Sequence, residues 1–157
     1  MKQRLALLLA ASCIFSLTSI EARSATCAAS SSGIAFGNYD TLASRARDTL
    51  GTVIVQCSGN VGEKVTYSIA LNRGTHGSPD RTMVSKANQL HYTLFLDPAR
   101  TLPWGNGTGG SSQITDSFYL DQAVTTKRYT IFARILASQG SDPAGAYNDI
   151  ATIILSY

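Results

Sequence analysis

The chain has 157 residues, of which 44% are hydrophobic and 15% charged, and its formal net charge is +3. This length is sufficient for one domain with a packed core. A predicted signal peptide (residues 1–24) holds three of the 13 basic and one of the 10 acidic residues, so the exported part has 10 basic and 9 acidic residues. This nearly neutral charge disfavours a function in binding nucleic acid or anionic membranes.

Residues 1–24 have the three parts of a secretory signal peptide. Two basic residues precede an apolar run at 5–17, and small residues surround the predicted cleavage after Ser24. The apolar run of about 13 residues is shorter than the roughly 20 that a membrane-spanning helix needs. A lipoprotein cleavage box ending at Cys13 is the alternative, but it lacks the usual leading leucine. We therefore expect residues 25–157 to form one exported domain that is not inserted in a membrane.

Two cysteines remain after the predicted cleavage. Cys13 leaves with the signal peptide, and Cys27 and Cys57 form an even pair in an oxidising compartment, which predicts a disulfide. The bond would close a loop of about 31 residues and contribute about 3–4 kcal/mol in the chain-entropy model. A metal site is the competing interpretation, but His76 and His91 are isolated in different segments. No metal or cofactor is expected.

The exported part alternates like β-strands and lacks the periodicity of helices. Strands are predicted at 33–36, 51–57, 64–71, 81–85, 90–97, 113–118 and 128–136, and a last one within 145–157. The clearest strands place these side chains on an inner face: Val53, Val55, Cys57; Val65, Tyr67, Ile69, Leu71; Leu90, Tyr92, Leu94, Leu96; Tyr129, Ile131, Ala133, Ile135. Gly, Asn, Asp, Ser and Pro residues lie between the strands. Short strands bounded by turns are typical of an all-β sandwich.

The last predicted strand is apolar on both faces. One face carries Ala151, Ile153, Leu155 and Tyr157, and the other face begins with Ile150. Such a strand is typical of a sheet interior. A long apolar edge without cover is prone to association. We therefore expect a partner to cover this strand, although the alternation does not decide which face is open to it.

The glycine-rich loop at 105–110 does not indicate nucleotide binding. It matches the spacing of a dinucleotide-binding fingerprint, but the helix that would have to follow it is missing. The loop also contains a glycosylation sequon at Asn106, which matters only in a eukaryotic secretory pathway. The neighbouring Trp104 could contact an external surface from the tip of the loop, or it could pack against the end of the sandwich. We favour the second interpretation.

The sequence contains no convincing catalytic arrangement. No serine lies in a nucleophile elbow, and no motif pairs two carboxylates. His91 alternates with the inner residues of its strand, so we expect it to face solvent. The prediction is that the protein is not an enzyme.

Several segments together resemble the spore coat protein U domain family, which includes subunits of archaic chaperone–usher pili. The resemblance covers residues 26–157, and its specificity comes from the order and spacing of the pieces. They are Cys27, then 33–40 (GIAFGNYD), 51–57 (GTVIVQC), 81–83 (RTM), 90–97 (LHYTLFLD), 104–107 (WGNG) and 145–149 (GAYND).

The resemblance implies an immunoglobulin-like sandwich that lacks its final strand and has a groove beside its C-terminal strand. In this family a periplasmic chaperone lends a strand to the groove, and during assembly at an outer-membrane usher a neighbouring subunit replaces it. Ala151, Ile153, Leu155 and Tyr157 would then be the partner-binding residues, with the Tyr157 carboxylate gripped by the chaperone. The implied function is a structural subunit of a fibre or coat that supports attachment and biofilm formation.

The N-terminal end departs from what a polymerising subunit needs. Only Ala25 and Thr26 precede Cys27 under the predicted cleavage, and residues 28–32 are small and polar. We therefore expect the chain to accept a strand but not to donate one, as a tip subunit would. The alternative function is a stand-alone secreted module or spore-coat-like protein that contacts carbohydrate or surfaces through loops such as 101–112.

Overall fold

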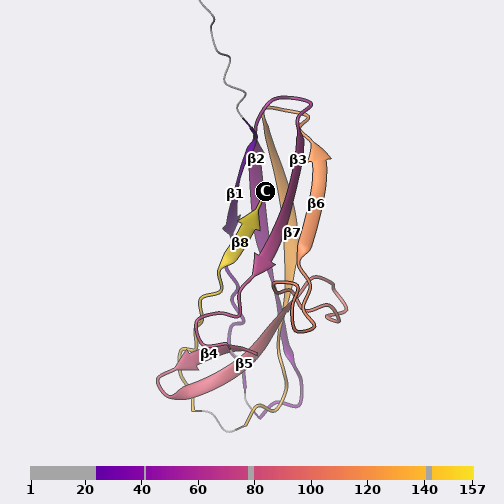
Figure 1. Ribbon diagram of the computed structural model, residues 1–157. Coiled ribbons are helices and arrows are strands. Elements are labelled where there is room, and N and C mark those ends of the chain that lie inside the picture. Colours follow the sequence, from indigo (N-terminus) through magenta and orange to yellow (C-terminus); the bar gives the residue numbers. More distant parts are fainter. Residues whose placement is uncertain (1–23, 41, 78–79, 141–142) are drawn as a thin grey trace, which may run out of the picture.

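The computed structural model describes residues 24–40, 42–77, 80–140 and 143–157 (Figure 1), so all of the predicted signal peptide except Ser24 lies outside the described residues. The described residues form eight strands and no helix, which confirms the all-β prediction. The strands are β1 (Thr26–Ser31), β2 (Arg47–Ser58), β3 (Lys64–Leu71), β4 (Arg81–Ser85), β5 (Asn88–Phe95), β6 (Ile114–Tyr119), β7 (Val124–Ile135) and β8 (Ile153–Ser156).

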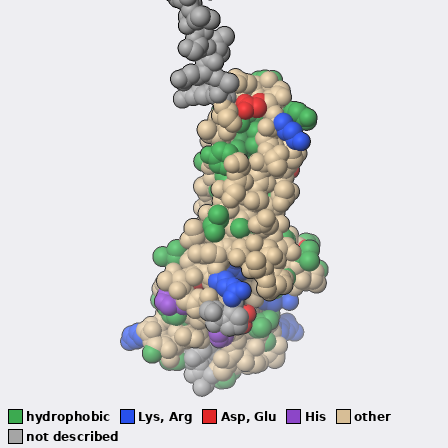
Figure 2. Space-filling model, viewed as in Figure 1, with side chains coloured by type: hydrophobic (Ala, Val, Ile, Leu, Met, Phe, Trp, Pro, Cys, Tyr) green, Lys and Arg blue, Asp and Glu red, His purple; other side chains and the backbone are tan. Residues whose placement is uncertain are grey.

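The strands form two antiparallel sheets that pack as a sandwich. One sheet has the order β1-β2-β7-β5-β4, and the other has the order β6-β3-β8. The pairing of β2 with β7 runs from Arg47 opposite Ile135 to Ser58 opposite Val124 and extends along most of the molecule (Figure 1). β5 joins the C-terminal end of β7 and carries β4 on its other side. On the face shown in Figure 2, hydrophobic side chains lie in several separate groups and charged ones are scattered.

The core lies between the inner faces of the two sheets, and the alternation of the sequence predicted most of it. The inner residues predicted for β2 and β3 are all buried, and of those predicted for 90–97 and 128–136 only Leu96 and Tyr129 are partly exposed. His91 is exposed, as expected. Trp104 has 0% exposed surface, and its indole N–H donates to the Ile69 carbonyl at 3.1 Å. The favoured prediction, that Trp104 packs against the sandwich, is confirmed. The alternative prediction, that Trp104 contacts a surface from the loop, is wrong.

β1 is held against β2 by backbone pairing and by the predicted disulfide. Cys27 lies directly opposite Cys57, with their Cα atoms 4.1 Å apart, and the disulfide joins them. We did not predict β1, because Ala28 and the serines after it carry too little apolar surface to alternate visibly. The strand is therefore defined by its partner and not by its own hydrophobic pattern.

Two predicted strands are not strands in the structure. Residues 33–36 do not pair in a ladder, because Gly33 and Gly37 adopt left-handed φ values of 72° and 69° that interrupt an extended chain. The predicted strand within 145–157 is regular only over β8. Before it, Asn148 forms an isolated bridge with Val84. Both irregular segments flank the candidate site.

Candidate functional site

Two free strand edges, one from each sheet, lie beside each other. β1 is the outer strand of the five-stranded sheet, and β8 is the outer strand of the three-stranded sheet. The two strands approach within 8 Å between Cα atoms (Figure 1), yet no ladder joins them in the described part of the chain. Each strand therefore presents backbone N–H and C=O groups that its own sheet does not use.

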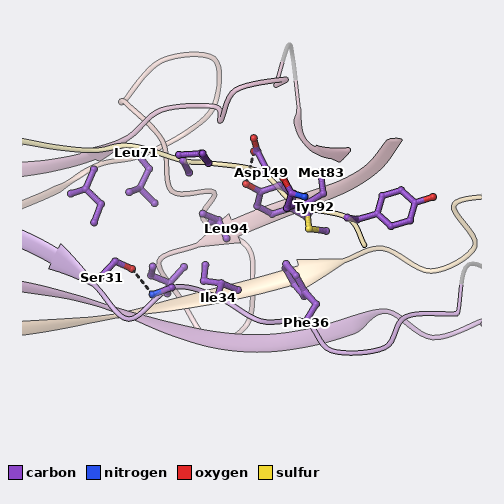
Figure 3. A pocket seen from close by; sticks show the side chains of 15 residues that line it. Ser31, Ile34, Phe36, Leu71, Met83, Tyr92, Leu94 and Asp149 are labelled. Carbon is purple, nitrogen blue, oxygen red and sulfur yellow. Dashed lines mark hydrogen bonds between the residues drawn. The ribbon is translucent and has the colours of Figure 1, made fainter. Parts of the chain in front are cut away.

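A groove continues from these edges toward the β4–β5 end of the molecule, and it is mainly apolar where it begins at Ser31 and Ile153 but more polar toward Asn38 and Asp40. It consists of two adjoining cavities of about 410 and 680 Å³, which share Ile34, Phe36, Met83 and Tyr147. One wall is the segment 31–40 that follows β1, and the other is the segment 143–153 that leads into β8. Figure 3 shows side chains from both walls and from the strands between them around the first cavity. Its apolar floor comes from three strands and consists of Leu71, Leu94 and Ile131.

The wall at 31–40 is held in place by side chains of β2. The Arg47 guanidinium donates to the Phe36 carbonyl at 2.8 Å, and the Thr49 hydroxyl donates to the Ala35 carbonyl at 3.0 Å. At Gly51, an added Cβ would lie 2.7 Å from a side-chain carbon of Ile34. The glycine therefore lets the wall pack closely on β2, and it directs Ile34 into the groove.

The structure decides which face of β8 lies inside. Ile153 and Leu155 pack against the core, whereas Ile154 is 46% exposed. Of the four predicted partner-binding residues, Ala151 and Ile153 line the groove. Leu155 lies further along β8, and Tyr157, which follows β8, is 64% exposed.

Sequence reasoning missed most of the groove. Ile34, Phe36 and Met83 were assigned only to strands, and Tyr92 and Leu94 were assigned to an ordinary core. Their apolar character was visible in the sequence. Only the sheet order places Met83, Tyr92 and Leu94 beside a gap between two edges, and only contacts to β2 place Ile34 and Phe36 there. Trp104 and Asn106 do not line the groove. Asn106 is exposed, and its side chain accepts from the Thr108 hydroxyl within its own loop.

Polar side chains also line these cavities, among them the hydrogen-bonded pair Tyr92 and Asp149. The Tyr92 hydroxyl donates to Asp149 at 2.8 Å, and burial together with this hydrogen bond raises the pKa of Tyr92 above its usual range. Tyr92 therefore remains a donor at neutral pH. Among the described residues, no group of three or more His, Cys, Asp or Glu side chains could hold a metal ion. No helix in the same residues is long and apolar enough to cross a membrane.

Comparisons with known proteins agree with the fold. The family model of the Spore Coat Protein U domain matches residues 11–154. No curated protein sequence matches the chain significantly. One similar solved structure is a chain of the CsuC–CsuE chaperone–tip adhesion subunit pre-assembly complex, from the archaic chaperone–usher Csu pili of Acinetobacter baumannii. The TM-score is 0.58 at 20% identity, and the match covers 85% of this chain but only 40% of that one, so it supports the fold alone.

Proposed function

Because the chain belongs to the spore coat protein U domain family, we propose that it is a structural subunit of an extracellular fibre or coat of the archaic chaperone–usher type. The observation that carries this proposal is the apolar groove that begins between the free edges of β1 and β8. A similar chain occurs in a complex described as a chaperone–tip subunit pre-assembly complex, and this also supports it. The role implies export to the periplasm and then display at the cell surface.

The groove suits one kind of occupant, an extended strand supplied by another polypeptide. Its backbone would pair with β1 on one side and β8 on the other, and alternate side chains would enter the groove over Ile34 and Ile131. Paired strands lie about 4.8 Å apart, so a strand inserted between β1 and β8 would require these two strands to be roughly 9.6 Å apart. Because β1 and β8 approach within 8 Å, insertion has to move them apart. In the proposed assembly, a periplasmic chaperone supplies the first strand and a neighbouring subunit replaces it at an outer-membrane usher.

The N-terminal end of the domain is poorly suited to donate a strand in return. The Ala25 N–H donates to the Glu63 carboxylate at 2.7 Å, β1 pairs with β2 from Thr26 onward, and the disulfide fixes Cys27. If cleavage follows Ser24, no free arm remains. We place the subunit at the end of a fibre, with a role in attachment and biofilm formation.

The test is to express the tagged chain in a bacterial periplasm, alone and with a periplasmic chaperone of the archaic chaperone–usher type. We expect the chain alone to aggregate, and co-expression to yield a soluble one-to-one complex. A stable, cooperatively folding monomer that the chaperone does not capture would refute strand acceptance. Sequencing the mature N-terminus tests the end position, because a long apolar arm upstream of Ala25 would contradict it.

A further inference from the structure

The groove wall at 145–152 has little backbone support of its own. Asn148 exchanges two backbone hydrogen bonds with Val84, at 2.9 and 3.1 Å, and the Asn72 N–H donates to the Thr152 carbonyl at 3.0 Å. Between these points, the described residues of the segment form no ladder. Side chains must therefore hold the intervening backbone in the position it has beside the groove.

Asp149 is the side chain that connects this wall to Tyr92 of β5, which also lines the groove. Its side chain is only 1% exposed, and its carboxylate accepts from the Tyr92 hydroxyl at 2.8 Å and from the Thr75 N–H at 2.9 Å. Asp149 and Tyr92 lie together at the groove in Figure 3. Gly74 covers the carboxylate: its φ is +85°, and an added Cβ would lie 1.9 Å from a carboxylate oxygen. Burying a carboxylate this deeply is costly unless hydrogen bonds satisfy it.

Two basic side chains lie near this carboxylate: the Nδ1 atom of His76 is 3.9 Å from an Asp149 oxygen, and Arg81 interacts electrostatically with Asp149. Arg81 is 7% exposed, and its guanidinium donates to the carbonyls of Asn72 and Trp104, each at 2.8 Å. Burial lowers the pKa of Arg81, and the negative charge of Asp149 opposes that shift. The side chain of Asn72 in turn accepts from the Thr152 N–H at 2.7 Å. The loop after β3 and the wall before β8 are thus joined at two points.

We propose that Asp149 and Tyr92 form a latch that positions the 145–152 wall, and with it the start of β8, for pairing with an incoming strand. The inference rests on the proposed function, since a positioned wall affects assembly only if a strand binds in the groove. A wall that is already ordered reduces the conformational entropy lost on binding, which strengthens capture. Asp149 and Tyr92 are therefore positioning residues, distinct from the apolar side chains that an incoming strand would contact.

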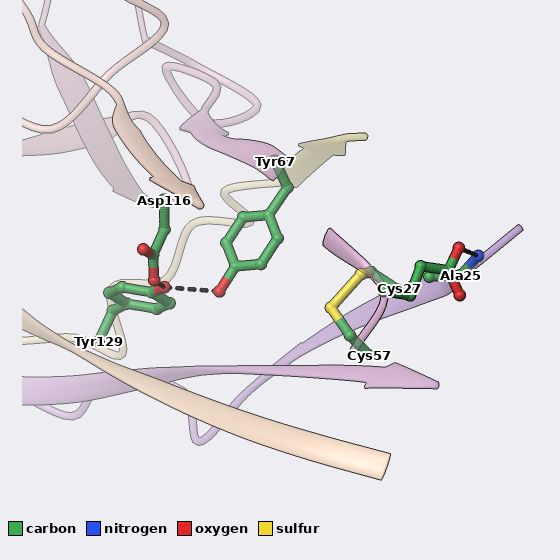
Figure 4. The surroundings of a disulfide bond; sticks show 7 residues. Ala25, Cys27, Cys57, Tyr67, Asp116 and Tyr129 are labelled. Atoms are coloured by element: carbon green, nitrogen blue, oxygen red, sulfur yellow. Dashed lines mark hydrogen bonds between the residues drawn. A yellow bond between two sulfur atoms is a disulfide. The ribbon is translucent and has the colours of Figure 1, made fainter. Parts of the chain in front are cut away.

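The chain offers a matched control for the test. Tyr129 also donates to a carboxylate, that of Asp116, in a second tyrosine–aspartate pair between the sheets (Figure 4). Tyr129 does not line the groove. Tyr92→Phe and Tyr129→Phe each remove a hydroxyl that donates to a carboxylate, and only the first lies at the proposed latch. The Tyr129 hydroxyl also shares a hydrogen bond with the Tyr67 hydroxyl at 2.6 Å, so Tyr129→Phe disrupts at least as many hydrogen bonds as Tyr92→Phe. Asp149→Asn serves as the conservative variant, because its amide oxygen can accept from the Thr75 N–H while its NH2 group donates to the Tyr92 hydroxyl.

Two readouts are taken on the exported full chain. Short-pulse hydrogen exchange followed by mass spectrometry measures opening of 145–152 in fresh monomer, and retention on immobilised chaperone measures strand capture. We expect Tyr92→Phe to accelerate exchange of 145–152 and to weaken retention, each by about tenfold, the size of one hydrogen bond to a charged group. Asp149→Asn should have a smaller effect, and Tyr129→Phe should change neither.

The outcomes separate the latch from the proposed function. If Tyr92→Phe and Tyr129→Phe give equal exchange at 145–152 and equal retention, the Asp149 contact is ordinary structural support and the latch is refuted. If the chaperone does not retain even the unsubstituted chain, strand acceptance fails. In that case faster exchange in Tyr92→Phe alone would still establish the latch as the device that holds this segment.

Discussion

Neighbouring isoleucines in β8 give a sharp test of the groove. Ile153 lines the groove and packs on the core, whereas Ile154 is 46% exposed on the outer face. We predict that Ile153→Asp abolishes capture by the chaperone, whereas Ile154→Asp leaves capture close to that of the unsubstituted chain. The two variants have the same composition and net charge, so solubility and electrostatic steering cannot explain a difference between them.

The size of the predicted loss of capture follows from the burial of the side chain at position 153. Full burial of an isoleucine side chain contributes about 1.5–3 kcal/mol, and Ile153, which is partly buried, realises a fraction of this. A carboxylate that a donor strand covers at this position would be buried without a partner, at a further cost of several kcal/mol. The combined loss corresponds to at least a thousandfold weaker capture, based on about 1.4 kcal/mol per tenfold. For Ile154→Asp, the typical effect of a surface substitution is about 0.5 kcal/mol.

The assay has to distinguish lost capture from lost folding. The chaperone complex is quantified by pull-down from periplasm, and thiol alkylation reports whether Cys27 and Cys57 are still bonded. We expect a formed disulfide in both variants, because the disulfide joins β1 to β2 and does not involve β8. If Ile154→Asp loses as much capture as Ile153→Asp, or if Ile153→Asp is captured normally, then β8 does not form the wall of an acceptor groove.

Two further predictions concern stability. Replacing Cys27 and Cys57 together by alanine should lower the free energy of unfolding by about 3–4 kcal/mol in urea titrations of freshly purified, dilute monomer, before it aggregates. A loss below about 1 kcal/mol would show that β1 is held mainly by its backbone pairing. A hydrogen bond from Arg134 lowers the pKa of Asp48. This stabilisation is present above the unfolded pKa of about 3.9 and is lost as pH falls through the lower folded value. Asp48→Asn should therefore be less stable than the unsubstituted chain at pH 6, and the difference should shrink steadily as pH falls below about 3.9.

Hydrophobic alternation predicted the layers of this fold well, because each inner face of a two-layer sandwich must be apolar. β3 and β4 have the predicted bounds, and β2, β5, β6 and β7 differ from theirs only at the ends. The disulfide followed from the count of exported cysteines. β1 could not be predicted in this way, since its small residues gain their strand conformation from pairing with β2.

From the sequence, the groove could be predicted only indirectly, as the expectation that a partner covers the apolar strand β8. Its walls are irregular segments whose positions depend on side-chain contacts to other strands, such as those of Arg47 and Asp149. Its floor combines residues from β3 to β7 that become neighbours only once the sheet order is known. The inner face of β8 is likewise fixed by its register with β3, in which Leu155 lies opposite Ile69. Local patterning carries no information about any of these relations.

The other free edge of the small sheet differs in chemistry from the groove side. β6 is an outer strand, but its inner face carries Asp116 between two apolar positions, and Tyr129 of β7 donates to this carboxylate. Burial and the bond to Asp116 raise the pKa of Tyr129, so the donor stays protonated. The ammonium group of Lys127, in β7, lies 4.6 Å from the ring centre of Phe118, in β6. Inward-pointing charges on an edge strand disfavour the addition of a further strand, because its apolar side chains would cover them. Between the two edges of the small sheet, this difference would direct strand addition to the β8 edge, beside β1, and away from the β6 edge.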